Sequence, residues 1–212
     1  MPNWCFNSEV IDGPKAEVKS LREKLVEWTS KNYCENGFGT EWLGNIVGFA
    51  GFKRIEEDEK QGFPCRGNIS SDFEYEECGD EAVIRFTSLT AYVCMPELWY
   101  AVIDKFAPHC KYYYFSEEPS NAFYMSNDTG HKYFDDSIVV DVCYDEERAP
   151  ETIKNHFPES GYDYSEEEVV RGLQDILKTD ESDIDKLIEE FNKKDVMGGT
   201  GYLQIYKVSY EE

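Results

Sequence analysis

The chain has 212 residues, of which 41% are hydrophobic and 15% aromatic, and its 44 acidic and 21 basic residues give a formal net charge of −23. This composition is typical of a globular protein with one large domain or two small ones. Charge of this sign repels phosphate backbones and anionic membranes, so we expect neither nucleic acid nor a membrane as a partner.

No targeting or cysteine-based motif is visible. The start lacks a signal-peptide pattern, and no apolar run approaches the roughly 20 residues that cross a bilayer. The seven cysteines are widely spaced and form no C-x-x-C pair, which favours reduced thiols over a disulfide framework or a zinc site. We therefore expect a cytoplasmic protein without a cofactor.

The opening residues predict a strand followed by a helix. Residues 4–11 have strand composition, and Gly13-Pro14 ends that strand and prepares a helix start. The next apolar residues recur every three or four positions and predict one helical stripe, formed by Val18, Leu21, Leu25 and Trp28.

The middle of the chain predicts further strands around one helix. A short amphipathic piece over 41–49 and a polar stretch over 53–68 make the region near 37–68 an insertion. Pro96 begins a helix that stops at Pro108. Strands are expected over 69–75, 82–90, 111–115, 122–126 and 137–144.

This order, β-α-(insertion)-β-β-α-β, predicts an α+β fold for residues 1–145. Its expected form is the ferredoxin-like, split βαβ arrangement, in which two helices cover one face of an antiparallel sheet.

Residues 146–212 predict an acidic helical extension, packed on the first domain. Ser165–Glu168 forms a capping box, a second helix is capped by Ser182 with Asp185, and 202–210 forms a last strand. Whether that strand rejoins the main sheet or belongs to a separate unit stays open.

Two stretches resemble the YubB-type ferredoxin-like family of phage, plasmid and Bacteroides-type genomes. The opening Met1-Pro2-Asn3-Trp4-Cys5-Phe6-Asn7 is similar to that family's M-[PA]-N-W-C-x-N motif. The segment from Arg85 through Met95-Pro96-Glu97 to Tyr114–Glu118 is similar to its strand, helix and following acidic strand. The resemblance implies a ferredoxin-like fold in a bacterial or mobile-element setting, and no particular activity.

Candidate catalytic patterns have simpler explanations. Asp128-Thr129-Gly130 is the tripeptide of retroviral-type aspartic proteases, but no apolar strand leads into the aspartate, so we expect a hairpin turn. The three histidines, His109, His131 and His156, lack metal-binding spacing. We predict no catalytic residue and no metal ligand.

The aromatic run Tyr112-Tyr113-Tyr114-Phe115 is the best binding candidate. On the open face of a ferredoxin-like sheet such residues stack RNA bases, but the basic-glycine-aromatic strand of those domains is missing. We predict a binding surface of Tyr112, Tyr114, Glu117 and Glu118, and we expect the C-terminal segment or another protein chain to cover its outward-facing aromatic residues.

These observations predict a non-catalytic protein-binding module. The alternative is an acidic DNA mimic or anti-restriction factor, which requires carboxylates in line at phosphate-like spacing and binding that weakens steeply with salt. An enzyme with an unrecognised site is the third possibility.

Overall fold

The structure is a computed structural model that describes residues 3–33, 37–135, 138–162, 164–194 and 196–211. The chain divides into two compact units. The first unit contains Met1–Tyr133 and Tyr210–Glu212, and the second unit contains Phe134–Ser209. The protein is α+β, with a mixed main sheet of seven strands and a separate two-stranded pair.

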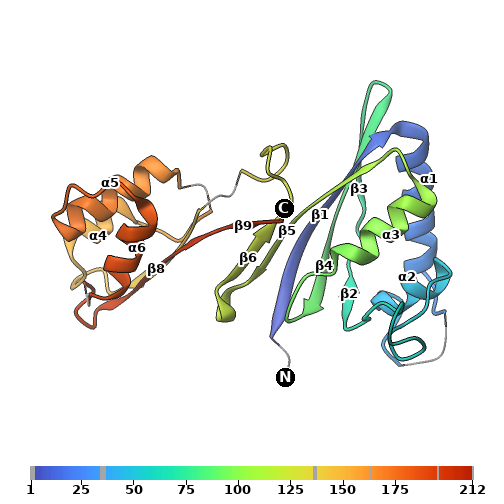
Figure 1. The fold of residues 1–212 in the computed structure, drawn as a ribbon, viewed down its shortest axis with the longest axis horizontal. Coiled ribbons are helices and arrows are strands. Elements are labelled where there is room, and N and C mark those ends of the chain that lie inside the picture. Colours follow the sequence, from blue (N-terminus) through green and yellow to red (C-terminus); the bar gives the residue numbers. More distant parts are fainter. Residues whose placement is uncertain (1–2, 34–36, 136–137, 163, 195, 212) are drawn as a thin grey trace. The chain divides into compact units, whose positions relative to one another are not determined.

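The first unit contains the main sheet (Figure 1). Its elements are β1 (Trp4–Pro14), α1 (Lys15–Thr29), α2 (Leu43–Phe49), β2 (Gly67–Ile69), β3 (Glu74–Cys78), β4 (Glu81–Ala91), α3 (Pro96–Phe106), β5 (Lys111–Glu118), η1 (Pro119–Asn121) and β6 (Phe123–Ser126). The sheet also includes β9 (Ser209–Tyr210), in which the chain passes from the second unit back to the first. The sheet order is β2-β4-β1-β5-β6-β9, and β3 also pairs with β4. The pairs of β1 with β4 and β5, of β4 with β2 and β3, and of β5 with β6 are antiparallel.

Strand β1 lies at the centre of the sheet because both its edges are paired. Its residues 4–14 pair with β4, and residues 6–12 pair with β5. The predicted strand is confirmed and extends to Pro14, which directly precedes α1. Since side chains alternate along a strand, Cys5, Asn7, Glu9 and Ile11 share one face and are all buried.

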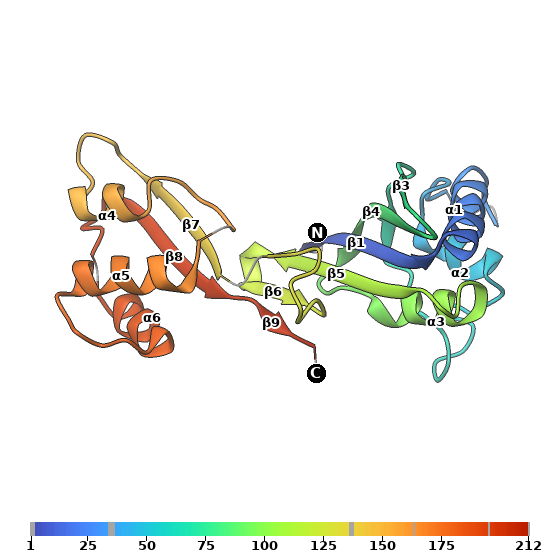
Figure 2. The ribbon, with the colours of Figure 1, turned by 90° about the horizontal axis from the view of Figure 1, so that it is seen from above.

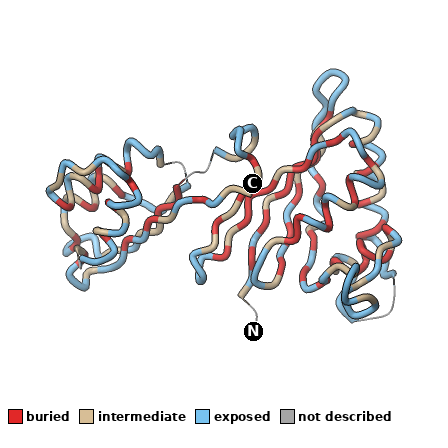
Figure 3. The backbone as a smooth tube through the Cα atoms, in the orientation of Figure 1, coloured by how far each residue is buried: buried red, intermediate tan, exposed pale blue. Residues whose placement is uncertain are grey.

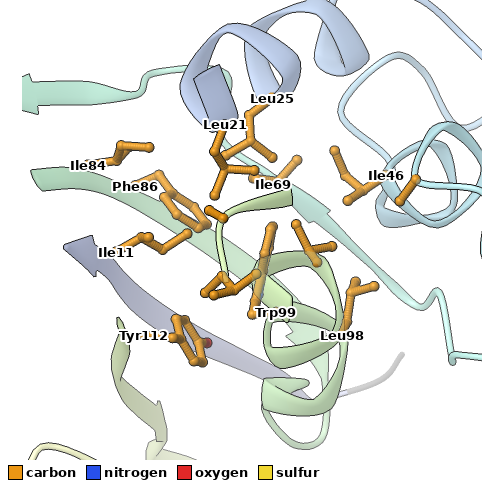
Figure 4. Packing of buried hydrophobic residues seen from close by; sticks show 14 of the residues in the cluster. Ile11, Leu21, Leu25, Ile46, Ile69, Ile84, Phe86, Leu98, Trp99 and Tyr112 are labelled. Carbon is orange, nitrogen blue, oxygen red and sulfur yellow. The ribbon is translucent and has the colours of Figure 1, made fainter. Parts of the chain in front are cut away.

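Helices α1 and α3 cover that same face. Leu21 and Leu25 of α1 and Leu98 and Trp99 of α3 meet strand residues such as Ile84 in one hydrophobic core (Figure 4). The predicted stripe of α1 is confirmed, because Val18, Leu21, Leu25 and Trp28 are all buried. Burying such a side chain fully stabilises the fold by about 1.5–3 kcal/mol.

The strand expected over 69–75 is two shorter strands. β2 ends at Ile69 and β3 begins at Glu74, and they pair with different halves of β4. The polar residues Ser70, Ser71 and Asp72 separate them, and Phe73 is buried in the core. Polar side chains in a row interrupt the alternation that a continuous strand requires.

The second unit is built on its own strand pair (Figure 2). Its elements are β7 (Ile138–Tyr144), α4 (Glu151–His156), α5 (Glu166–Leu177), α6 (Ile184–Asn192) and β8 (Gly201–Lys207). β7 and β8 pair antiparallel, and the three helices share a core with them that includes Val140, Phe157 and Leu173.

The second unit changes two expectations. The strand at 138–144 was expected in the domain 1–145, but it pairs with β8 in the second unit. The final strand, left open above, is divided: Gly201–Lys207 stays in the second unit, while β9 joins β6 in the main sheet. Periodicity predicts a strand but not its partner, because pairing depends on residues far away in sequence. Among the described residues, no helix has the length and apolar character needed to span a membrane.

Candidate functional site

The predicted binding tyrosines lie inside the first unit. Tyr112 and Tyr114 are buried, because their register opposite Ile11 and Glu9 puts them on the helix-covered face of the sheet. Their rings stack with centroids 5.7 Å apart. The Tyr112 hydroxyl donates to Glu9, and that of Tyr114 donates to Glu211 at 3.2 Å. The expectation that these two rings form an exposed surface is therefore corrected.

The two predicted glutamates lie on opposite faces of β5. Glu118 is buried on the same face as the tyrosines and accepts a hydrogen bond from the Ser120 hydroxyl. Glu117 is half-buried and, by alternation, lies on the other face. The four residues therefore share no single surface.

A saturated polar cluster lies under the helices where β1, β4 and β5 meet. The Asn7 amide donates to the Ser88 hydroxyl at 3.1 Å and to the Thr90 hydroxyl at 3.0 Å, and its carbonyl accepts from the Ser116 hydroxyl at 2.7 Å. Since Asn7 is 1% exposed, these bonds fasten three strands together away from solvent.

Glu9 is the ionisable group of this cluster. Its carboxylate accepts from the Ser88 hydroxyl at 2.6 Å and from the Tyr112 hydroxyl. Desolvation by burial raises the pKa of Glu9 to about 7, although the hydrogen bonds oppose that rise. The group is sealed from solvent, so its role is structural.

The other candidate groups are also engaged in structure. The Asp128 carboxylate accepts from the Tyr133 backbone N–H at 2.7 Å, in a turn that leads out of β6 rather than back to a paired strand, so the expected hairpin is corrected. His109 bonds to Glu17 at 2.7 Å and His156 to Asp175 at 3.1 Å. No group of three or more described His, Cys, Asp or Glu side chains is placed to hold a metal ion.

Three buried cysteine thiols are poor nucleophiles, because burial raises their pKa as it raises that of Glu9. Burial raises the pKa of Cys5, Cys65 and Cys110 to about 12 in each case. A thiol with so high a pKa carries almost no thiolate at neutral pH.

A half-open hollow in the second unit is lined mainly by side chains that already have partners. It has a volume of about 200 Å³ and is lined by Asn155, His156, Tyr164, Glu168 and Arg171. His156 is paired with Asp175, Glu168 with Ser165, and Arg171 with Glu167 at 2.9 Å. These side chains stabilise the helices of the unit.

A different pocket has the features of a binding site. It lies where the ends of β1, β2 and β4 meet the 37–66 segment, and its volume is about 270 Å³. We call it the aromatic pocket; its lining residues are Trp4, Phe38, Trp42, Glu56, Cys65, Arg66, Gly67, Asn68 and Ala91. Its walls are largely three aromatic rings.

Trp42 is held in place from several sides. Its indole N–H donates to the Cys65 carbonyl at 2.6 Å, and the Phe38 ring lies 5.2 Å from its ring. The indole lies so close to Gly44 that a Cβ there would come within 2.2 Å of it. The guanidinium of Arg54 lies over the same ring at 5.7 Å. This wall of the pocket is therefore preformed.

Arg66 and Glu56 are the two charged residues in the lining of the aromatic pocket. The Arg66 carbonyl accepts from the Ala91 N–H at 2.9 Å, and its guanidinium lies 5.7 Å from the Tyr92 ring centroid. Tyr92 has φ of 73° and donates its N–H to the Asn3 carbonyl at 2.9 Å. Among the described residues, no carboxylate lies within ion-pair distance of Arg66.

A second, larger hollow lies on the other side of Arg66. It has a volume of about 540 Å³, shares Arg66 and Ala91 with the aromatic pocket, and includes Lys60 and Glu97. Lys60, like Arg66, has no ion-pair partner in the described part of the chain.

Exposed apolar side chains continue from the pocket. Trp4 and Phe6 are each 48% exposed, and Leu89, which faces Phe6 in the β1–β4 register, is 36% exposed. Because side chains alternate along a strand, they lie on the sheet face opposite the one that holds Cys5 and Asn7, which is the face that the helices cover. Figure 3 shows buried and exposed residues alternating along the strands of the main sheet. We call Trp4, Phe6 and Leu89 the apolar strip.

Sequence reasoning missed this site, although one signal was present. Large apolar residues at even positions of β1 alternate with Cys5, Asn7 and Glu9 at odd positions, a pattern usually interpreted with the polar set outward. Here the polar set is buried. Comparisons with protein-family models, curated proteins and solved structures found no match.

Proposed function

We propose that this chain is a non-catalytic protein-binding module that acts through the apolar strip and the aromatic pocket. The observation that carries the proposal is the pair of half-exposed rings of Trp4 and Phe6 beside a preformed aromatic hollow. Aromatic residues that are partly exposed next to a pocket are the usual anchors of protein interfaces.

We further propose that the first unit belongs to the ferredoxin-like class. The chain order β1-α1-β3-β4-α3-β5 and the sheet order β5-β1-β4-β3 support this, because a split βαβ unit places its strands in that order. The resemblance of the opening motif to the YubB-type family agrees with this class, and family membership stays a prediction.

The charge distribution favours a binding module over a DNA mimic. The second unit contains 20 acidic and 8 basic residues, yet at least eight of these carboxylates form ion pairs within that unit, such as Glu189 with Lys193 and Glu190 with Lys194. Carboxylates paired with lysine present less negative charge to a basic groove than DNA phosphates do.

The test is quantitative affinity purification from extracts of the source cells. Wild-type protein is compared with Trp4→Thr/Phe6→Thr, which keeps β-forming residues in β1, and with Tyr162→Thr/Tyr202→Thr as a matched control in the second unit. Tyr162 and Tyr202 are 39% and 46% exposed. Far-UV circular dichroism verifies that each variant folds.

We expect at least one protein that wild type and control retain and the Trp4/Phe6 variant loses. Because apolar burial drives this contact, it should persist in about 0.5 M salt. Retention by all three proteins would contradict the proposal. Loss of all binding at high salt would favour the DNA mimic.

A further inference from the structure

The size of the aromatic pocket selects a small occupant. Its volume of about 270 Å³ lies below the roughly 300–1,000 Å³ of pockets that enclose a drug-sized ligand. It is half-open, so an occupant can enter while still attached to a chain. One side chain with a flat ring matches the walls formed by Trp4, Phe38 and Trp42.

The charges around the pocket favour an anion next to that ring. In a chain with 44 acidic and 21 basic residues, Arg66 and Lys60 nevertheless lack ion-pair partners among the described residues, and both line the adjoining hollow. Arg54, over Trp42, is paired with Glu57 at 2.8 Å, so its charge is already compensated. Glu56 in the pocket and Glu97 in the hollow oppose the charge of Arg66 and Lys60.

Arg66 differs from these two glutamates in position, because it lines both hollows, whereas Glu56 lines only the pocket and Glu97 only the adjoining hollow. Arg66 directly precedes β2, its carbonyl is bonded to Ala91, and its guanidinium lies at the Tyr92 ring. Gly67 beside it allows close approach of the strands, since a Cβ there would come within 2.2 Å of the Leu89 carbonyl. Arg66 and Glu56 are both exposed, and Glu56 lies in a turn. A planar guanidinium can bind a carboxylate through two parallel N–H donors.

We propose that the aromatic pocket binds the C-terminal aromatic residue of a partner polypeptide, with its ring between Trp4 and Trp42 and its terminal carboxylate at Arg66. The inference rests on the proposed protein-binding function and names the chemistry of the partner. A terminal carboxylate is attached two bonds from the Cβ that bears the ring, so ring and charge reach adjacent parts of one small site. The preceding residues of the partner leave across the apolar strip.

The four tryptophans allow a direct test by ¹⁹F NMR of protein labelled with 5-fluorotryptophan. Trp4 and Trp42 line the pocket, whereas Trp28 and Trp99 are 6% and 1% exposed in the core and serve as internal controls. The resonances are assigned with Trp4→Thr and Trp42→Phe. The probes are N-acetyl-Gly-Gly-Phe with a free carboxylate, its C-terminal amide, N-acetyl-Gly-Asp-Phe amide and phenethylamine.

We expect the free acid to shift the Trp4 and Trp42 resonances and to leave those of Trp28 and Trp99 in place. The amide should bind roughly tenfold more weakly, since it lacks a charge-assisted bond to Arg66. Arg66→Gln should reduce the affinity of the acid to that of the amide. Lys19→Gln is the control, because Lys19 is exposed on α1 and its substitution also removes one positive charge. It should leave the affinity of the acid unchanged.

Three results would overturn the inference. The first is that the free acid leaves the Trp4 and Trp42 resonances unshifted. The others are that either amide binds as tightly as the free acid, or that phenethylamine binds more tightly than the free acid. Failure here is distinguishable from failure of the proposed function. If binding of a cellular partner depends on Trp4 and Phe6 while no tripeptide binds, the proposed protein-binding function is retained. Only the assignment of a C-terminal aromatic residue to the pocket is then rejected.

Discussion

At the scale of single residues, the polar side chains of β1 are the main surprise. A glutamate and an asparagine in a central strand would ordinarily be assigned to the solvent face. Asn7 and Glu9 instead lie beneath the helices, because Ser88, Ser116 and Tyr112 on the two neighbouring strands supply their hydrogen-bond partners. Those partners are 79 to 109 residues away in sequence, so a local pattern cannot reveal them.

Glu9 makes the stability of the first unit depend on pH. Its pKa is about 7 in the folded protein and 4.5 when unperturbed. Between pH 4.5 and pH 7, Glu9 is therefore protonated in the folded state and ionised in the unfolded state. Stability should therefore fall as pH rises from about 4.5 to about 7, by about 3 kcal/mol in total from this group.

Replacing Glu9 by Gln should remove this dependence. The variant should match wild type near pH 4.5 and be more stable at pH 8, since the hydroxyls of Ser88 and Tyr112 can accept as well as donate. Urea unfolding followed by tryptophan fluorescence measures the difference across pH 4.5–8. Glu81→Gln is the control, because it makes the same chemical change at an exposed position. An unchanged pH slope in Glu9→Gln would contradict the assignment.

At the scale of elements, local signals predicted most of the helices and strands. The capping box of α5 is confirmed, with Ser165 accepting from the Glu168 N–H and Glu168 accepting from the Ser165 N–H. The cap of α6 was predicted one residue too early. Asp183 occupies that position, and its carboxylate accepts from Asp185 and Lys186 backbone N–H groups at 3.1 and 3.2 Å.

Two neighbouring substitutions test this correction. Asp183→Ala should destabilise the second unit by about 1 kcal/mol, because two N–H groups of the first turn lose their acceptor. Ser182→Ala should change stability by less than about 0.5 kcal/mol, since Ser182 is exposed and does not cap the helix. Urea unfolding followed by far-UV circular dichroism gives both values. Equal losses in the two variants would return the cap to Ser182.

What the sequence could not supply is the pairing between elements. The β-branched run at 138–144 predicts a strand equally well for either unit. Its partner, β8, begins 57 residues after Tyr144, and only the shared core with Leu173 and Phe157 fixes that choice. The aromatic pocket is hidden for the same reason, since Trp4, Trp42 and Arg66 come from three separate segments.

At the scale of the whole molecule, the two units have separate hydrophobic cores with no member in common among the described residues. All four tryptophans belong to the first unit, so their fluorescence reports the unfolding of that unit alone. Helical circular dichroism reports both units. Comparing tryptophan fluorescence with helical circular dichroism therefore distinguishes the unfolding of the first unit from that of the second.

Leu173→Ala should reveal two unfolding transitions. Leu173 is fully buried in the core of the second unit, and its truncation should cost about 2–5 kcal/mol. In urea, part of the helical signal should be lost earlier while the fluorescence midpoint stays in place. Leu25→Ala, equally buried in the first unit, should shift the fluorescence midpoint instead. Coincident shifts of both signals in either variant would show that the units unfold as one.

The return of the chain to the main sheet has a consequence for how this protein can be rebuilt. The chain leaves the first unit after Tyr133 and re-enters it at Tyr210, and the rings of His131 and Tyr210 lie 5.7 Å apart. The points at which the chain leaves and re-enters the first unit are therefore close together, and the second unit is an insertion in a loop of the first. We expect that a short glycine linker can replace the second unit and that the same two points can accept another domain.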